Sequence, residues 1–492
     1  MDPTNTRPHL VIVGGGVAGL AAAFFLRDEA VRVTVLEGSP RLGGKLSVSE
    51  IAGVAVDEGA EALLVTRPEG TGLIAQAGLG GERVEPGPTS SAIWTLGAMR
   101  PLPRRQFMGV PSDLVELAES GVLTGEGVAR ARQDLVLPPT ARDGDVPVAA
   151  YVGTRFGAEV VDRLVDPLLG GVYAGRSADL SFDATLPALS AASRRYRSLA
   201  EAARSLLPAL AGDQGETPAA GTRSGGSVFT TLAGGLGQLP SYLAKASGAE
   251  IRTSSMAREL SRGSAGLRGW RLTVGSAAAE EQVAADAVIL AVPARPAARL
   301  LAAVPGAAAA VAALSEISYA SMAIVTLAYP SSAFPGAGLA ALGWSGYLVP
   351  AVDGRAVKAV TFSTVKWPHL AGGTARGGEP LEIVRCSVGR VGDEAVLQCA
   401  DDDLAALAAA EFAQATGVRG GPVARRVTRW GGALPQYTVG HLDRVARIRA
   451  AVASQPGLAV CGAAYDGVGI PACIATARAA VSQVMTFLTG RP

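Results

Sequence analysis

The chain has 492 residues, of which 49% are hydrophobic and 18% are charged. This composition predicts a folded globular protein of two or three domains and excludes a disordered chain. The 44 Lys and Arg residues nearly balance the 43 Asp and Glu residues, for a formal net charge of +1. A nearly neutral chain has no bulk electrostatic attraction for nucleic acid, so we expect no nucleic-acid partner.

The cysteines and histidines give no sign of a disulfide framework or a metal site. The four cysteines lie in the last quarter of the chain, none forms a CxxC pair, and the three histidines are scattered. We therefore expect buried free thiols in a reducing cytoplasm. The N-terminal "MDPTNTRPHL" lacks the pattern of a signal peptide, and no run of about 18 apolar residues is present, so no transmembrane segment is expected.

The chain opens with a strand–turn–helix–strand pattern. The apolar run 9–13 predicts a buried parallel strand, 17–28 a helix, and "VRVTVLEG" (31–38) a second strand. Together they predict one βαβ unit with a right-handed crossover.

The turn inside this unit carries a G-x-G-x-x-G motif. Gly14 permits the tight turn, Gly16 lets the backbone approach a pyrophosphate, and Gly19 allows the helix to pack on the strand. Glu37 ends the second strand, where an acid can accept hydrogen bonds from the ribose. Because the motif follows a strand and opens a helix, it predicts a dinucleotide site at the helix N-terminus.

The following region has a helical pattern over residues ~100–215. Within it, "GAEVVDRLVDPLL" (157–169) predicts a helix that is stopped by Pro167 and Gly170–Gly171. The Gly-, Ser- and Pro-rich stretch 209–227 predicts a mobile loop.

Later segments predict a second sheet and the completion of the first one. Residues 318–400 alternate β-rich runs with turns, which favours an antiparallel sheet, and 401–417 predicts a helix. The apolar strand 286–293, and the strand, Gly-rich turn and Ala-rich helix of 457–488, read as further parts of the N-terminal sheet. The dinucleotide domain is therefore expected to be discontinuous.

A second motif separates FAD from NAD. Arg41, Gly43 and Gly44 form an R-x-G-G stretch just after the ribose acid, where two glycines free the backbone to wrap a larger cofactor and the Arg can neutralise phosphate charge. At this point the chain resembles the FAD-dependent amine-oxidase and protoporphyrinogen-oxidase superfamily. In that group a C-terminal glycine-rich helix start approaches the flavin, and here the matching stretch is "CGAAYDGVGIPACIATARAA".

The resemblance narrows within the inserted regions. The runs "RFGAEVVDRLVDPLLGGVYAG", "VFTTLAGGLGQLPSYL", "WSGYLVP", "VTFSTVKWPHLA" and "RWGGALPQYTVGHLDRV" are similar to the porphyrinogen oxidases of haem biosynthesis, in their actinobacterial type. The resemblance implies a six-electron oxidation of a porphyrinogen by molecular oxygen, which releases hydrogen peroxide. It implies coproporphyrinogen III or protoporphyrinogen IX as the substrate and ferrochelatase as a transient partner.

One departure from the family pattern bears on the substrate. Eukaryotic members carry an Arg–Phe pair where this chain has Ser91 and Ala92, before "GAMRPLP". The difference favours coproporphyrinogen III and leaves protoporphyrinogen IX as the alternative. An amine oxidase or desaturase is a further alternative, although 5% aromatic residues is low for an aromatic-lined amine site. A non-catalytic nucleotide-binding protein is the alternative from a different class.

The resemblance implies a set of FAD contacts. Carried over position by position, they are Gly14, Gly15, Gly16, Val17, Ala18, Gly19, Glu37, Arg41, Lys45, Gly59, Ala60, Glu61, Ala62, Ala257, Ala463, Val468, Gly469 and Ile470. Lys45 stands where some relatives carry an aromatic residue, and Ala257 where most carry Val. Trp430 either flanks the flavin or is core. The surroundings of Cys473 do not match a covalent flavin attachment motif, so FAD is expected to bind non-covalently.

Three residues are candidates for substrate binding. Leu348 and Tyr347 in "WSGYLVP" would form one wall of the site, or belong to ordinary core. Lys366 would hold a propionate, or is a solvated lysine at a strand edge. No nucleophilic triad or paired acid and base is found or needed, because the flavin carries the hydride transfer.

The expected architecture is α/β: a Rossmann-type FAD-binding domain with an inserted helical domain and an inserted α+β substrate domain. The FAD-binding domain would comprise residues 1–95, 225–300 and 440–492. The helical insertion would be 96–224, and the substrate-binding domain 301–439.

Overall fold

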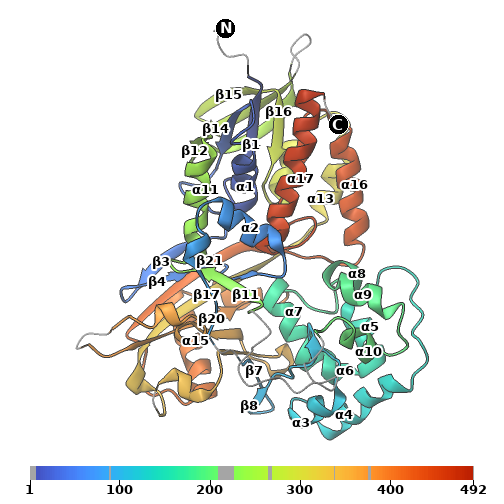
Figure 1. The fold of residues 1–492 in the computed structure, drawn as a ribbon, viewed down its shortest axis with the longest axis vertical. Coiled ribbons are helices and arrows are strands. Elements are labelled where there is room, and N and C mark those ends of the chain that lie inside the picture. Colours follow the sequence, from blue (N-terminus) through green and yellow to red (C-terminus); the bar gives the residue numbers. More distant parts are fainter. Residues whose placement is uncertain are drawn as a thin grey trace.

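The computed structural model describes residues 7–87, 90–208, 227–263, 269–336, 338–374 and 378–490. These residues form three parts: a domain around a parallel sheet, which carries both chain ends, a second sheet domain and a helical insertion (Figure 1). Except for Ser227, the mobile loop predicted at 209–227 lies outside the described residues.

The first part is built on five parallel strands in the order β12-β2-β1-β16-β22. Their bounds are β12 Glu250–Arg252, β2 Arg32–Leu36, β1 His9–Val13, β16 Ala287–Leu290 and β22 Leu458–Val460. Leu10 of β1 stands opposite Val33 on one side and Ala287 on the other. The strands expected near the N-terminus, at 286–293 and near the C-terminus are confirmed, and they meet in one Rossmann-type sheet as predicted.

Strand β1 shows why its sequence is a continuous apolar run. Leu10 and Ile12 belong to the core under α1 (Val17–Phe25), α11 (Leu239–Ser247) and α17 (Ile470–Thr489). Val11 and Val13 belong to the core on the opposite face. A strand covered on both faces cannot alternate apolar with polar residues.

The opposite face is covered by helices and by a small antiparallel sheet. The helices are α12 (Ala294–Leu301), α13 (Ala308–Ser315) and α16 (His441–Ala453). The sheet is β13-β14-β15, with bounds Ala257–Arg262, Trp270–Ser276 and Ala279–Ala285.

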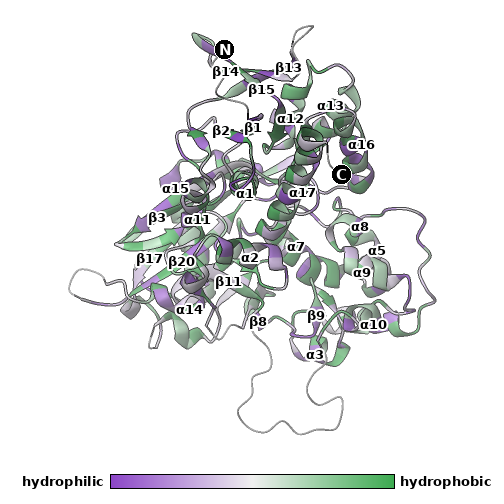
Figure 2. Ribbon diagram, turned by 45° about the horizontal axis from the view of Figure 1, so that its top comes forward, coloured by the Kyte–Doolittle hydropathy of each residue, from purple (hydrophilic) through white to green (hydrophobic). Residues whose placement is uncertain are grey.

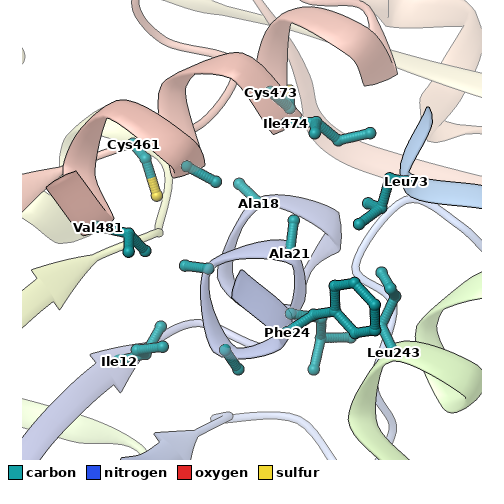
Figure 3. Packing of buried hydrophobic residues seen from close by; sticks show 14 of the residues in the cluster. Ile12, Ala18, Ala21, Phe24, Leu73, Leu243, Cys461, Cys473, Ile474 and Val481 are labelled. Carbon is teal, nitrogen blue, oxygen red and sulfur yellow. The ribbon is translucent and has the colours of Figure 1, made fainter. Parts of the chain in front are cut away.

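Helix α1 is the centre of the first core. Its alanines are short enough for α17 to approach closely, and Figure 3 shows Ala18 near Cys473 of α17, while Phe24 lies toward Leu243 of α11 and Leu73 of α2 (Pro68–Gln76). Each of these five residues is at most 6% exposed. The packing brings the two ends of the chain into one hydrophobic core.

Helix α17 is the one helix of the described residues that is long and apolar enough to cross a membrane, with a mean hydropathy of 1.2. It packs against α1, α2 and β22 and supplies Ile474, Ala477, Val481 and other residues to the core. These contacts are those of a core helix.

The second part is a seven-stranded sheet in the order β21-β17-β20-β19-β18-β7-β8. Their bounds are β21 Ala424–Pro435, β17 Tyr319–Pro330, β20 Leu381–Val388, β19 Val357–Phe362, β18 Gly346–Leu348, β7 Ala92–Thr95 and β8 Ala98–Pro101. Neighbours are antiparallel except β18 and β7, which run parallel. Helix α15 (Asp401–Thr416), predicted at 401–417, packs on β21, β17, β19 and β20.

The hairpin β7–β8 corrects one predicted boundary. The boundary between residues 95 and 96 would divide this hairpin between two domains, yet both strands lie at the edge of the seven-stranded sheet. Leu96 and Gly97 close the hairpin with φ of +53° and +73°. The pairing of β7 with β18 joins segments far apart in the chain, which local sequence patterns do not report.

The helical insertion packs around its own core. It contains α3 Leu114–Glu119, α4 Gly125–Arg132, α5 Val148–Phe156, α6 Ala158–Val160, a π-helical turn Val161–Val165, α7 Asp166–Tyr173, α8 Phe182–Thr185, α9 Pro187–Ser193 and α10 Leu199–Arg204. Figure 2 shows α7 lying between α5 and α9 of the insertion and the rest of the molecule. Helix α7 packs on β18 and β19.

The helix predicted to stop at Pro167 and Gly170–Gly171 instead runs on to Tyr173 and ends where Ala174 turns left-handed, with φ of +50°. Pro167 is tolerated because the π-helical turn 161–165 precedes it and places it in the first turn of α7, where a missing N–H costs little. The prediction of the stop was therefore wrong.

Short strands connect the parts. They are β3 Val48–Ile51 with β4 Val54–Asp57, β5 Leu63–Leu64 and β6 Arg83–Val84 on either side of β11 Phe229–Leu232, and β9 Gln106–Phe107 with β10 Val110–Pro111. The short helix α14, Ser363–Lys366, follows β19.

Candidate active site

The three glycines of the opening turn have three different reasons to be glycine. A Cβ on Gly14, whose φ is +112°, would lie 2.4 Å from the carbonyl oxygen of Ala291, and a Cβ on Gly19 would lie 1.9 Å from the carbonyl oxygen of Gly14. A Cβ on Gly16 would meet nothing within 4 Å. Gly14 and Gly19 therefore pack the turn, whereas Gly16, the N-cap of α1, faces open space where a ligand can approach the helix N-terminus. Val17 starts that helix.

Glu37 stands at the end of β2 and closes the turn. One carboxylate oxygen accepts the Gly15 N–H at 2.7 Å, and the other accepts the Ser39 N–H at 2.7 Å. A carboxylate has further acceptor capacity, so ribose hydroxyls can bind to the same oxygens. The Ser255 N–H donates to the backbone carbonyl of Glu37, which places half-buried Ala257, at the start of β13, on the same side.

The R-x-G-G stretch lies directly beside the glycine turn. The Gly43 N–H donates to the carbonyl of Gly15 at 2.8 Å, and Arg41 donates to the carbonyl of Gly44 at 2.8 Å. The Arg41 guanidinium is 5.7 Å from the ring centre of Trp430. The R-x-G-G stretch and the glycine turn thus lie side by side, and we call them the candidate cofactor site.

Lys45 follows the R-x-G-G stretch directly in the chain. Burial lowers the pKa of its ammonium. Among the described residues, none accepts a hydrogen bond from this ammonium. A half-buried cation without a partner in the described part of the chain leaves a binding position for an acceptor group of a ligand.

The C-terminal turn meets α1 from the other side. Position Gly462 approaches Ala18, since a Cβ there would lie 4.0 Å from that of Ala18, and the Gly462 N–H donates to the hydroxyl of Thr476 at 2.9 Å. Ala463 follows, and Gly469 caps the N-terminus of α17 at Ile470. Because β1 and β22 are parallel members of one sheet, the N-termini of α1 and α17 lie at the same edge.

The loop after β4, residues 58–62, joins the candidate cofactor site to the second sheet. A Cβ on Gly59 would lie 2.0 Å from the carbonyl oxygen of Lys45. Ala60 is exposed and Ala62 half-buried. The Trp430 indole donates to the carbonyl of Glu58 at 2.9 Å and so ties this loop to β21.

Glu61 forms a charge cluster with two cations of the second sheet domain. Lys366 donates to one carboxylate oxygen at 2.8 Å, Arg385 contacts the other, and Arg385 also donates to the carbonyl of Gly59 at 2.6 Å. Burial alone would raise the pKa of Glu61, but the two cations outweigh it and hold the pKa at about 2. The loop is therefore fixed to the sheet by full charges.

Asp57 lies under the same loop in a different electrostatic state. Burial raises its pKa to about 6, although the N–H groups of Leu236 and Gly237 donate to its oxygens at 2.9 and 2.8 Å. The pKa values of these two neighbouring carboxyl groups are thus shifted in opposite directions.

A cavity of about 810 Å³ opens beside this loop. Its walls are mostly apolar, and among the described lining residues Lys366 is the one cation and Glu85 the one anion. The wall includes Leu102, Leu168, Val228, Phe229, Leu348, Ala359 and Val360. Such a space suits a large apolar ligand.

The two residues predicted from "WSGYLVP" face different ways. Both residues line the cavity, and Leu348 is half-buried. Tyr347 is 2% exposed, and its ring packs edge-on against Trp94 and Phe362 in the core. Successive residues of a strand point to opposite faces, so the two side chains leave β18 on opposite sides.

Sequence reasoning missed Arg385 and Tyr437. Arg385 sits in the strand "LEIVRCSV" and is 6% exposed, and a buried charge requires a partner. The Tyr437 hydroxyl bonds to Ala463 and Gly467 of the C-terminal turn.

A parallel Rossmann-type sheet with glycine turns at the N-termini of α1 and α17, combined with a large, mostly apolar cavity in the same molecule, is the arrangement of a nucleotide-binding enzyme. The chain matches the family described as flavin containing amine oxidoreductase over residues 17–485. It belongs to this family of flavin-dependent oxidases.

Relatives and solved structures agree with this family. The chain is 38% identical to the coproporphyrinogen III oxidase of Mycobacterium tuberculosis over 486 residues, which cover 97% of each chain. It is 30% identical to that of Bacillus subtilis, over 99% of each chain. A crystal structure of a candidate protoporphyrinogen oxidase from an Exiguobacterium species has a TM-score of 0.81 and 29% identity, and covers 97% of this chain and 99% of that one.

The residues present fit a flavin nucleotide. Open space at Gly16, the ammonium of Lys45, which no described residue pairs, and the two helix N-termini together offer donors to the anionic and carbonyl groups of such a cofactor. When bound, a flavin supplies a hydride acceptor. The part left to the protein would be to hold a substrate and to exclude water from it.

Proposed function

We propose that this protein oxidises coproporphyrinogen III to coproporphyrin III with FAD and molecular oxygen. The porphyrinogen loses six hydrogens, that is six electrons and six protons, and three oxygen molecules take them up as three hydrogen peroxide molecules. The observation that carries the proposal is the mostly apolar cavity of about 810 Å³. Its Lys366 pairs with Glu61 in the loop that joins the candidate cofactor site to the second sheet.

The cavity chemistry favours a macrocycle over a small amine. Apolar side chains such as Leu168, Phe229 and Leu348 can pack on a tetrapyrrole ring, and Val228 and Phe229, 52% and 42% exposed, extend the apolar surface outward. A single lysine cannot neutralise four propionates. We infer that Lys366 binds one propionate and that the others face solvent.

The FAD contacts are assigned in the same proposal. Gly14 to Gly19, Glu37, Arg41 and Ala257 would hold the adenosine and pyrophosphate half. Lys45, Gly59 to Ala62, Ala463 and Val468 to Ile470 would surround the flavin half. The assignment of the flavin-side contacts is supported by the positions of the α17 N-terminus and of the loop after β4.

Non-covalent binding is supported by the state of Cys473. Burial raises the pKa of its thiol to about 11, so it is protonated and a poor nucleophile at neutral pH. We expect acid-precipitated protein to be colourless and its supernatant yellow. A yellow pellet would contradict non-covalent binding.

The decisive experiment compares the two porphyrinogens. We expect kcat/KM for coproporphyrinogen III to exceed that for protoporphyrinogen IX by about tenfold or more, with about three oxygen molecules consumed per porphyrin. A preference for the dicarboxylate would replace the substrate by protoporphyrinogen IX, as named for the Exiguobacterium structure and for a Macaca fascicularis relative 28% identical to this chain. The absence of any porphyrin product with FAD bound would overturn the proposal.

The coproporphyrin product would pass to a metal-inserting enzyme of the ferrochelatase class in the cytoplasm. A pull-down with a ferrochelatase from a relative would test this transfer.

A further inference from the structure

Three side chains form hydrogen bonds with backbone groups of the turn between β22 and α17. The Gly462 N–H donates to Thr476, and His441 Nε2 lies 3.0 Å from the carbonyl oxygen of Tyr465. Burial lowers the pKa of His441 to about 4, so the ring is neutral at neutral pH and donates this bond as the Nε2–H tautomer. The third side chain is Tyr437, and it makes two bonds.

Tyr437 connects the two ends of the turn 463–467 through its hydroxyl. Its hydroxyl donates to the carbonyl of Ala463 at 2.7 Å and accepts the N–H of Gly467 at 2.8 Å. The residue is 1% exposed, and burial raises the pKa of the hydroxyl, so it stays protonated and able to donate. Gly467 has φ of +142°, and a Cβ there would lie 2.8 Å from that of Ala472, so this backbone has little freedom once Tyr437 holds it.

The ring of Tyr437 also contacts the helical insertion. It stacks on the His441 ring at 3.7 Å between centres and 14° between planes, and lies 5.6 Å from the ring of Tyr173. Tyr173 ends α7, the helix whose Leu168 lines the cavity. One side chain thus touches both the cofactor-side turn and the helix that forms the cavity wall.

We propose that Tyr437 is a positioning residue that holds the turn 463–467 in its cofactor-binding shape before the flavin arrives, and that it sets this turn relative to α7. The inference rests on the proposed function only in taking Ala463 and Val468 to Ile470 as flavin contacts. It adds a role for a residue that contacts neither substrate nor cofactor.

The chain offers a matched control for the test. Tyr465 is also a buried tyrosine of this region, at 1% exposure, but its hydroxyl has no hydrogen-bond partner among the described residues, and its ring belongs to the core of α12, α13 and α16. Tyr437→Phe removes two hydrogen bonds and leaves the half-buried Gly467 N–H and Ala463 carbonyl without this partner. Tyr465→Phe removes none within the described part of the chain.

FAD titration of the full-length apoprotein, followed by flavin fluorescence, is the first measurement. We expect Tyr437→Phe to raise the dissociation constant about tenfold and Tyr465→Phe to change it less than about twofold. The visible circular dichroism of bound flavin should change in Tyr437→Phe alone. The gain in melting temperature on FAD binding should also shrink in Tyr437→Phe, which a purely structural role would leave unchanged. Equal dissociation constants for wild type and Tyr437→Phe, or equal losses in both variants, would overturn the proposal.

Hydrogen exchange of the wild-type protein keeps the proposal testable if Tyr437→Phe fails to fold. The Gly467 amide should exchange slowly without FAD as well as with it. Fast exchange without FAD would show that the cofactor, not Tyr437, orders the turn. These readouts need no porphyrinogen, so they can fail or succeed independently of the substrate. A wild-type chain that binds no FAD would instead sink the proposed function.

Discussion

Lys366 and Glu61 form an ion pair of 2.8 Å that joins the 810 Å³ cavity to the loop after β4. The side chains are 21% and 14% exposed, so the pair is only partly screened by water. Lys366 also faces the rings of Phe229 and Trp367, at 5.7 and 5.2 Å. A substrate carboxylate that reaches Lys366 must therefore share its ammonium with Glu61, and the strength of that sharing can be measured.

Replacing Lys366 with Met should raise KM for coproporphyrinogen III about five- to tenfold and change kcat much less. The reason is that the ammonium binds the carboxylate equally in the ground state and in the transition state, so its removal weakens binding uniformly. Lys366→Arg keeps the charge and should stay within about threefold of wild type. Steady-state kinetics with both variants measures this. An unchanged KM together with a lowered unfolding free energy would show that Lys366 serves only to anchor Glu61.

Acid should loosen the same cluster over a defined range. The pKa of Glu61 is held at about 2, against 4.5 for an ordinary glutamate, so its contribution is complete above pH 4.5 and is lost as pH falls toward 2. Below pH 4.5 this group alone should reduce the free energy of unfolding by up to ~1.4 kcal/mol per pH unit. Urea unfolding of wild type and Glu61→Gln between pH 3 and 7 tests it. The stability gap between them should narrow below pH 4.5, and a gap that stays constant would contradict the assignment.

The parts of the fold that sequence predicted are those with local signals. The buried run 9–13, the glycine turn and the second strand report themselves, because one short segment contains both the periodicity and the turn residues. The assignment of 286–293 and of the C-terminal strand to the same sheet as β1 followed from the same apolar pattern.

What sequence left undetermined depends on distant partners. Arg385 meets Glu61 across 324 positions, and Tyr437 meets Ala463 through a turn that no periodicity marks. Which face of the sheet the side chains of Tyr347 and Leu348 take depends on the orientation of β18 within its sheet, which is fixed by its pairing with β7 and β19.

Two glycines of the opening turn allow its role in packing to be tested apart from its role in cofactor binding. Gly16→Ala adds a methyl group to open space, so the melting temperature of the apoprotein should change little, while FAD affinity should fall at least about tenfold because the methyl group occupies the approach of the pyrophosphate. Gly19→Ala would push a Cβ to within 1.9 Å of the Gly14 carbonyl oxygen and should destabilise the apoprotein itself. Differential scanning fluorimetry without FAD, followed by FAD titration, distinguishes them. Normal FAD binding by Gly16→Ala would show that the cofactor does not approach this edge.

The helical insertion contains a buried ion pair between Asp134 and Arg155. Asp134 and Arg155 are 0% and 2% exposed at 2.5 Å, and Asp134 also accepts bonds from Ser198 and from the N–H groups of Leu199 and Ala200. Asp134→Ala leaves a buried guanidinium without its counter-charge and should cost ~3–5 kcal/mol of unfolding free energy.

Asp466→Ala is the matched control, because it breaks a pair with Arg449 that is about half exposed, and it should cost under ~1 kcal/mol. Chemical denaturation of the FAD-loaded protein, with flavin release and tryptophan fluorescence followed together, measures both variants. If Asp134→Ala unfolds the insertion as its own unit, the tryptophan and flavin transitions of that variant will separate; a loss no larger than that of Asp466→Ala would mean that the insertion's core is held by its apolar packing, with Asp134 and Arg155 contributing little.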